Sequence, residues 1–114
     1  MRRLVLLVMV AAVAMVFSAP AFAQDAAKIA QGDKVYTREK CSICHAIAGK
    51  GNKKFPLDGV GSKLTADQIR EWNVNPKAAA AKAKSTATPA MKAYDKLSKE
   101  DLDALVAYLG SLKQ

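Results

Sequence analysis

Two long stretches after residue 24 place their hydrophobic residues at helical spacing, one near each end of the chain. The first stretch, residues 26–39, carries Ile29, Gly32, Val35 and Tyr36. The second stretch follows Ser98, a typical N-cap residue, and carries Leu102, Leu105, Val106 and Leu109. Each pattern predicts an amphipathic helix. No stretch alternates hydrophobic and polar residues convincingly enough to predict a strand, so we predict an all-α fold.

Between these two helices, the sequence predicts a loop and two shorter helices. Residues 49–63 are rich in Gly, Lys and Asn, which indicates a loop. A capping box, Thr-Ala-Asp-Gln, opens a predicted helix over residues 65–72. An Asn-Pro pair then predicts an N-cap and first helical position for residues 75–84. We expect residues 85–92 to be extended, because the proline among them disfavours the α region for the residue before it.

The first 23 residues have the organisation of a secretory signal peptide. Arg2 and Arg3 precede the unbroken apolar run Leu4–Phe17, and Ala21-Phe22-Ala23 is a small-x-small cleavage sequence. We therefore predict that residues 1–23 are removed and that residues 24–114 form one domain in the periplasm. The alternative is an uncleaved membrane anchor, although the apolar run is shorter than the roughly 20 residues that span a bilayer.

Loss of the leader changes the composition of the chain. It removes two of the 18 basic residues and leaves 10 acidic ones, so the mature chain has a net charge of +6. The mature chain also keeps one methionine, Met91, and one histidine, His45. Export and the lack of a nucleic-acid-binding motif argue against nucleic acid as a partner despite the basic charge.

The chemistry of the chain centres on Cys41-Ser42-Ile43-Cys44-His45. Cys-x-x-Cys-His is the attachment motif of a c-type haem. Two thiols three residues apart can form thioether bonds to the two vinyl groups on one porphyrin edge. The adjacent histidine can then serve as an axial ligand of the iron. We predict one haem c, attached through Cys41 and Cys44 and ligated by His45.

Three other interpretations of the two cysteines are weaker. Thioredoxin-like sites accompany a βαβ pattern, which is not found here. A structural zinc site needs four ligands, but the whole chain has two cysteines and one histidine. A disulfide between residues 41 and 44 would close too short a loop to stabilise the fold much.

Met91 is the predicted second axial ligand of the iron. It is the one thioether left in the mature chain, and it follows Thr88-Pro89-Ala90 in the predicted extended segment. Methionine is among the side chains that ligate haem iron. The alternatives are a core-filling Met91, a lysine ligand from the same segment, or an open iron site.

From the helix before Cys41 to its C-terminus, the chain resembles a small class I cytochrome c. The haem motif lies near the mature N-terminus, Pro56–Thr65 is similar to the family's proline-containing segment, and Pro89-Ala90-Met91 is similar to its methionine loop. A C-terminal amphipathic helix follows in the same order. The resemblance implies a shell of short helices around one haem.

The resemblance also implies roles for individual residues. The carbonyl of Pro56 would accept a hydrogen bond from Nδ1 of His45, and Trp72 would donate its indole N–H to a haem propionate or to another partner. Phe55 stands where the family often has glycine. Gly32 and Tyr36 would cross Leu105 and Tyr108 of the last helix, the alternative for Gly32 being an early helix end.

Two filled axial positions leave no site for a substrate, so we predict a one-electron carrier that is not an enzyme. We expect a monomer that meets acidic patches of redox proteins through exposed lysines, if these surround the haem edge; a merely solvated surface is the alternative. The lysines are Lys50, Lys53, Lys54, Lys77, Lys82, Lys84 and Lys92. Alternative functions are a haem-based ligand sensor or weak peroxidase with a displaceable Met91, and a bound subunit of a periplasmic dehydrogenase.

Overall fold

A computed structural model describes residues 21–114. The helices are α1 (Ala21–Arg38), the 3-10 helix η1 (Cys41–Ile43), α2 (Val60–Lys63), α3 (Ala66–Val74), α4 (Pro76–Lys82) and α5 (Lys99–Gly110). The strands are β1 (His45–Ile47), β2 (Lys50–Gly51) and β3 (Phe55–Pro56). Arg2, Arg3 and the apolar run of the predicted leader lie outside the described residues, so leader cleavage stays a prediction.

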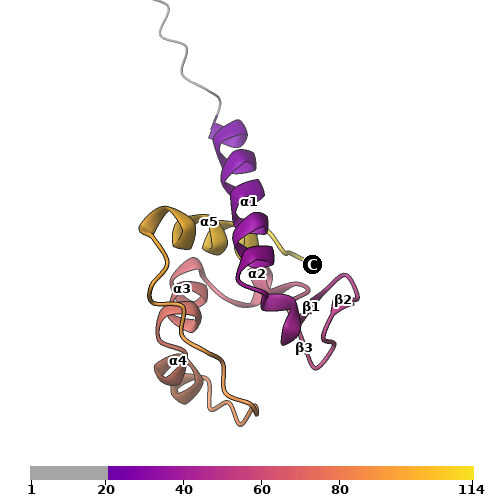
Figure 1. Ribbon diagram of the computed structural model, residues 1–114, viewed down its shortest axis with the longest axis vertical. Coiled ribbons are helices and arrows are strands. Elements are labelled where there is room, and N and C mark those ends of the chain that lie inside the picture. Colours follow the sequence, from indigo (N-terminus) through magenta and orange to yellow (C-terminus); the bar gives the residue numbers. More distant parts are fainter. Residues whose placement is uncertain (1–20) are drawn as a thin grey trace, which may run out of the picture.

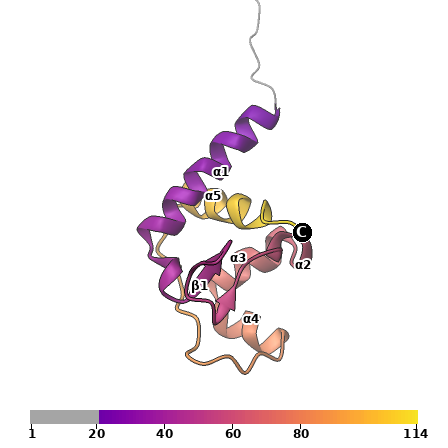
Figure 2. The ribbon, with the colours of Figure 1, turned by 90° about the vertical axis from the view of Figure 1, so that its right-hand side faces the viewer.

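The two terminal helices cross and form the centre of the core. Figures 1 and 2 show α1 passing over α5 in both views. Their buried side chains pack together with one residue of α3; the cluster comprises Val35, Tyr36, Ile69, Leu105, Val106 and Leu109. The rings of Tyr36 and Tyr108 meet edge to face, with centroids 5.7 Å apart. The predicted helix crossing is confirmed.

Gly32 lies at the closest approach of α1 and α5. A β-carbon at this position would overlap the carbonyl of Ala104 and the β-carbon of Tyr108. The helix continues through Gly32 to Arg38, so the alternative of an early helix end is wrong. Close packing offsets the roughly 1 kcal/mol that glycine costs in a helix relative to alanine.

Side-chain caps start the three later helices at the predicted residues. Thr65 and Gln68 exchange side-chain and main-chain hydrogen bonds, which completes the capping box of α3. Asn75 accepts from the N–H of Ala78 at the start of α4, and Ser98 accepts from the N–H of its N3 residue at the start of α5. These bonds satisfy N–H groups that otherwise lack partners at a helix start. The observed α4 ends at Lys82, two residues before its predicted end.

A small sheet and a short helix occupy part of the stretch that was predicted to be loop. The strand order is β2-β1-β3, with β2 antiparallel and β3 parallel to β1. Each strand has only two or three residues, too few to show alternation in the sequence. The fold remains mostly helical, as predicted. The sheet contains His45, which is the first residue of β1.

The segment between α4 and α5 contains no helix or strand, which agrees with the extended conformation predicted for residues 85–92. In Figure 1 this segment, coloured orange, returns along the side of α3 and α4 before α5 begins. Its later part, residues 92–97, lines one cavity together with Glu39, which follows the last residue of α1.

Candidate functional site

The two cysteines lie on a single tight turn between α1 and β1. Lys40 has φ 57°, a left-handed conformation that ends the helical path and starts η1 at Cys41. The N–H of Cys44 donates to the carbonyl of Cys41 over 3.1 Å, which closes the turn. Both thiols are free, Cys41 half-buried and Cys44 exposed. The disulfide interpretation is therefore not what the structure shows.

His45 follows this turn and is held by the strand opposite it. The parallel register of β1 and β3 pairs His45 with Phe55, and Nδ1 of His45 lies 2.9 Å from the carbonyl oxygen of Phe55. A carbonyl oxygen only accepts hydrogen bonds, so Nδ1 carries the proton of the neutral ring. Nε2 is then left with a lone pair that can bind a metal.

The acceptor of this bond differs from the predicted one by a single residue. The resemblance assigned the role to the carbonyl of Pro56, whereas the structure assigns it to Phe55. The β1–β3 pairing explains the difference, because Pro56 pairs with Ala46 and not with His45. Its direct contact with a cofactor stays a prediction.

Burial keeps the thiol of Cys41 protonated. Desolvation, followed by the negative charge of Glu39, raises its pKa to about 11. A redox-active Cys-x-x-Cys site needs the opposite arrangement, in which positive surroundings lower the pKa and stabilise a nucleophilic thiolate. The environment of Cys41 thus argues against thioredoxin-like chemistry.

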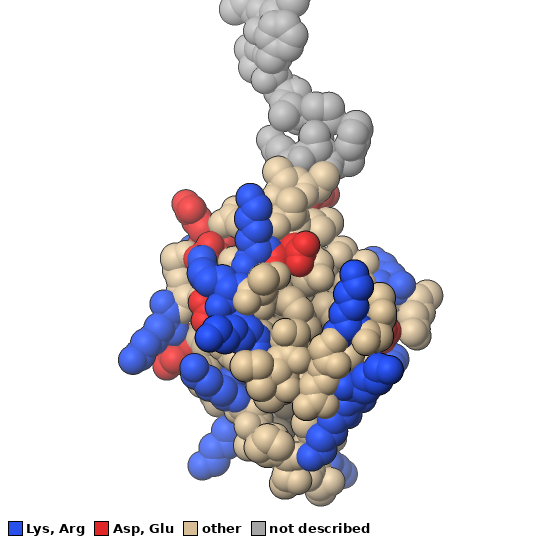
Figure 3. Space-filling view, turned by 45° about the vertical axis from the view of Figure 1, so that its right-hand side comes forward, with Lys and Arg blue, Asp and Glu red and all other residues tan. Residues whose placement is uncertain are grey.

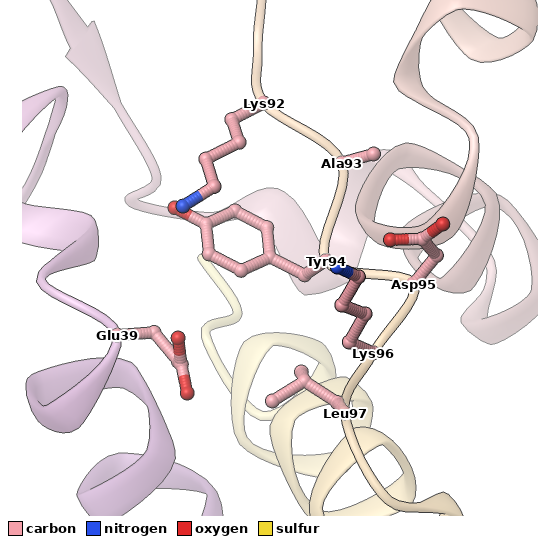
Figure 4. A pocket seen from close by; sticks show the side chains of 7 residues that line it. All are labelled: Glu39, Lys92, Ala93, Tyr94, Asp95, Lys96 and Leu97. Atoms are coloured by element: carbon pink, nitrogen blue, oxygen red, sulfur yellow. The ribbon is translucent and has the colours of Figure 1, made fainter.

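A cavity of about 460 Å³ lies between Glu39 at the end of α1 and residues 92–97. Figure 4 shows the ring of Tyr94 and the carboxylate of Glu39 facing the cavity from different elements. Burial is the main cause that raises the pKa of the Tyr94 hydroxyl. Two free thiols on one turn and an imidazole with an available Nε2 fit a covalently attached haem. The cavity is lined by Glu39, two residues before Cys41, but not by either cysteine or His45.

Met91 is the one residue between 81 and 93 that is not exposed. Its neighbours Ala90 and Lys92 are both exposed, whereas Met91 is partly buried. This burial suits an inward-facing ligand, and equally a packing role. Trp72 lies half-buried on α3, and its contact with a propionate stays a prediction.

The seven lysines named from the sequence are all exposed. Figure 3 shows blue Lys and Arg side chains around a central area of uncharged residues on one face, with red acidic side chains nearer α1. Lys82 is less available than its sequence position suggested, because it forms an ion pair with Glu71 at 2.7 Å. Exposed Ile43, between the two cysteines, has 66% of its surface accessible.

Two residues that support the site were missed by the sequence analysis. Besides the Phe55 carbonyl, Asn52 holds the haem-motif turn: its N–H donates to the carbonyls of Ser42 and His45, and its Nδ2 donates to Ile43. An asparagine in a Gly- and Lys-rich stretch gives no sign of such contacts, because they depend on how the chain folds back.

Other classes of site find little support within residues 21–114. In this range, no three His, Cys, Asp or Glu side chains are grouped as a metal site. No helix of the described chain is both long and apolar enough to cross a bilayer.

Comparison with protein families matches residues 29–113 to the family described as Cytochrome c. The matched range includes the haem motif, the small sheet, the segment that carries Met91 and α5. Comparison with curated proteins and with solved structures gave no match.

Proposed function

The chain belongs to the cytochrome c family, and from this premise we propose that it is a periplasmic carrier of single electrons. Membership supports haem-based electron transfer with covalently bound haem c. Our finer proposal is that one haem is attached to Cys41 and Cys44 and ligated by His45 and Met91. When bound, this group supplies an iron that exchanges one electron between Fe(III) and Fe(II).

The observation that carries the proposal is the hydrogen bond between His45 and Phe55. It fixes both the tautomer and the plane of the imidazole, so Nε2 needs no rearrangement to act as a ligand. A ligand that is already oriented changes little when the iron changes charge, which favours fast electron transfer. The β1–β3 pairing thus prepares the proximal side of the site.

The partial burial of Met91 within an exposed loop supports the second half of the proposed ligand set. A thioether on iron raises its reduction potential and fills the last coordination position. Substrate then has no place to bind, which is why we propose a carrier and not an enzyme. A ligand sensor or weak peroxidase would require Met91 to leave the iron readily.

Charge and exposure support a transient partner with an acidic surface. The exposed lysines that follow the haem motif, Lys50 and Lys53, lie in the same part of the chain as the exposed Ile43. Positive charge around a small apolar contact would speed encounter without making a stable complex. We propose a monomer that docks briefly on redox proteins; nothing in the charge pattern calls for nucleic acid or a membrane.

Acid–acetone extraction of the mature protein, followed by mass spectrometry of the polypeptide, tests the attachment. We expect the colour to stay with the chain and the mass to include one haem. The Cys41→Ala/Cys44→Ala double variant should release its haem into the solvent. Extraction of haem from the unaltered protein would contradict the proposal. Carbon monoxide binding by the untreated ferrous protein would favour the sensor.

A further inference from the structure

Lys54 connects the haem-motif side of the candidate site with the loop that carries Met91. Its ammonium donates to the carbonyl oxygen of Thr88 over 2.5 Å, between residues 34 positions apart in sequence. Thr88 lies three residues before Met91, so the contact holds the loop that carries the proposed ligand.

Few other contacts hold this loop. At its start, the N–H of Ser85 donates to the carbonyl of Ala80 over 2.9 Å. At its end, the N–H of Tyr94 donates to the carbonyl of Asn73 over 2.6 Å. Of the hydrogen bonds described for residues 86–93, the one to Lys54 is the only one that reaches a distant part of the chain. Removal of this bond would leave the loop anchored at its two ends.

Lys54 is itself tied to the turn that carries the haem motif. Its main-chain N–H donates to Oδ1 of Asn52 over 3.0 Å, and Nδ2 of Asn52 donates to the carbonyl of Ile43 over 3.1 Å. The ammonium also lies 5.4 Å from the ring centroid of Phe55, whose carbonyl holds His45. A continuous set of contacts therefore runs from the His45 side to the Met91 loop.

We propose that Lys54 is a positioning residue that keeps Met91 in place and thereby sets how readily an external ligand displaces it. The inference rests on the proposed ligation of iron by Met91. Lys54 does not touch the iron; it acts by restricting the loop. Loss of its hydrogen bond raises the fraction of molecules in which the loop has moved away.

The size of the effect follows from population arithmetic. An external ligand binds only when Met91 has left, so its apparent dissociation constant is inversely proportional to the fraction of displaced loop. A single hydrogen bond of this kind changes such an equilibrium by about three- to tenfold. Apparent affinity for the external ligand should rise by the same factor when the bond is removed.

The test titrates the oxidised haem-loaded protein with imidazole and follows the absorption spectrum. Lys54→Ala should bind imidazole about three- to tenfold more tightly than the unaltered protein. Lys53→Ala is the matched control, since Lys53 is equally exposed and carries the same charge; it should change the affinity less than about twofold. Lys54→Arg keeps a cationic donor and should restore most of the original affinity.

Amide hydrogen exchange of Tyr94, whose N–H donates to the carbonyl of Asn73 at the end of the loop, gives a second measurement that does not depend on the iron. Exchange should be faster in Lys54→Ala than in Lys53→Ala. Equal imidazole affinities in the two alanine variants would overturn the role of Lys54. A Met91→Ala variant that binds imidazole no better than the unaltered protein would instead overturn Met91 ligation, and with it this role, even if exchange of the Tyr94 amide still responded to Lys54.

Discussion

Nδ1 of His45 lies 2.9 Å from the carbonyl oxygen of Phe55, directly across the parallel pairing of β1 and β3. A main-chain acceptor cannot be lost through substitution of a side chain, so the orientation of the imidazole depends on the path of the backbone. The short three-stranded sheet therefore controls the orientation of the His45 imidazole.

Gly32→Ala should destabilise the protein although alanine is the better helix former. Its β-carbon would overlap the Ala104 carbonyl, and forcing α1 and α5 apart should lower the free energy of unfolding by about 1–2 kcal/mol. Urea denaturation of the haem-loaded protein measures the change. Gly110→Ala is the control, because a β-carbon there meets open space. It should be neutral or slightly stabilising, and equal losses in both variants would contradict the close packing at Gly32.

The ion pair between Arg38 and Asp101 should make stability depend on acid pH. Hydrogen bonds from Arg38 and then from Gln31 hold the pKa of Asp101 below its usual value. A lowered pKa in the folded state adds stability that is complete above the ordinary value of about 4 and is lost as the pH falls below it. Asp101→Asn should therefore flatten the fall in unfolding free energy below about pH 4.

Denaturation at a series of pH values checks this dependence. Asp95→Asn serves as the control, because Asp95 is exposed and forms no ion pair with another described residue. The role assigned to Asp101 would be wrong if both variants kept the acid dependence of the unaltered protein. Added salt should weaken the effect of Asp101, since the pair lies at the surface.

The sequence predicted the helices α1, α3, α4 and α5 and identified the haem motif because these signals are local, whereas the short helix α2 was missed. Thr65, Asn75 and Ser98 act as caps through bonds that span only three residues. The crossing of α1 with α5 was implied by the resemblance to class I cytochromes c and not by the spacing of apolar residues. The strands escaped prediction because two or three residues carry no periodicity. The resemblance pointed to the carbonyl of Pro56 as the acceptor of the hydrogen bond from His45, whereas the acceptor is the carbonyl of the preceding residue, Phe55.

The supporting contacts of the site were beyond sequence reasoning for a different reason. Lys54 and Thr88 are both exposed, and one partner is a main-chain oxygen that any residue would provide. Asn52 likewise reaches main-chain carbonyls that its sequence position does not reveal. Such contacts depend on the relative placement of two loops, which only the folded chain shows.

Lys53→Glu should slow electron transfer to an anionic oxidant such as ferricyanide. Reversing a charge beside the haem-motif turn weakens the attraction between the protein and the anionic oxidant. We expect the rate constant to fall about twofold or more at low salt, and this difference to disappear at high salt. Lys113→Glu makes the same change of charge at the exposed C-terminal end. Stopped-flow measurements that find equal slowing in both variants would show that net charge, and not the lysines near the motif, guides encounter.

The iron ligands are tested most directly by the absorption spectrum and midpoint potential of Met91→Ala, measured beside the unaltered protein. With Met91 on the iron, the oxidised unaltered protein should show the weak long-wavelength band of thioether-ligated ferric haem. The variant should lose this band, bind external ligands freely and have a lower potential, while its haem stays attached. A Met91→Ala variant with the spectrum and potential of the unaltered protein would contradict ligation of the iron by Met91.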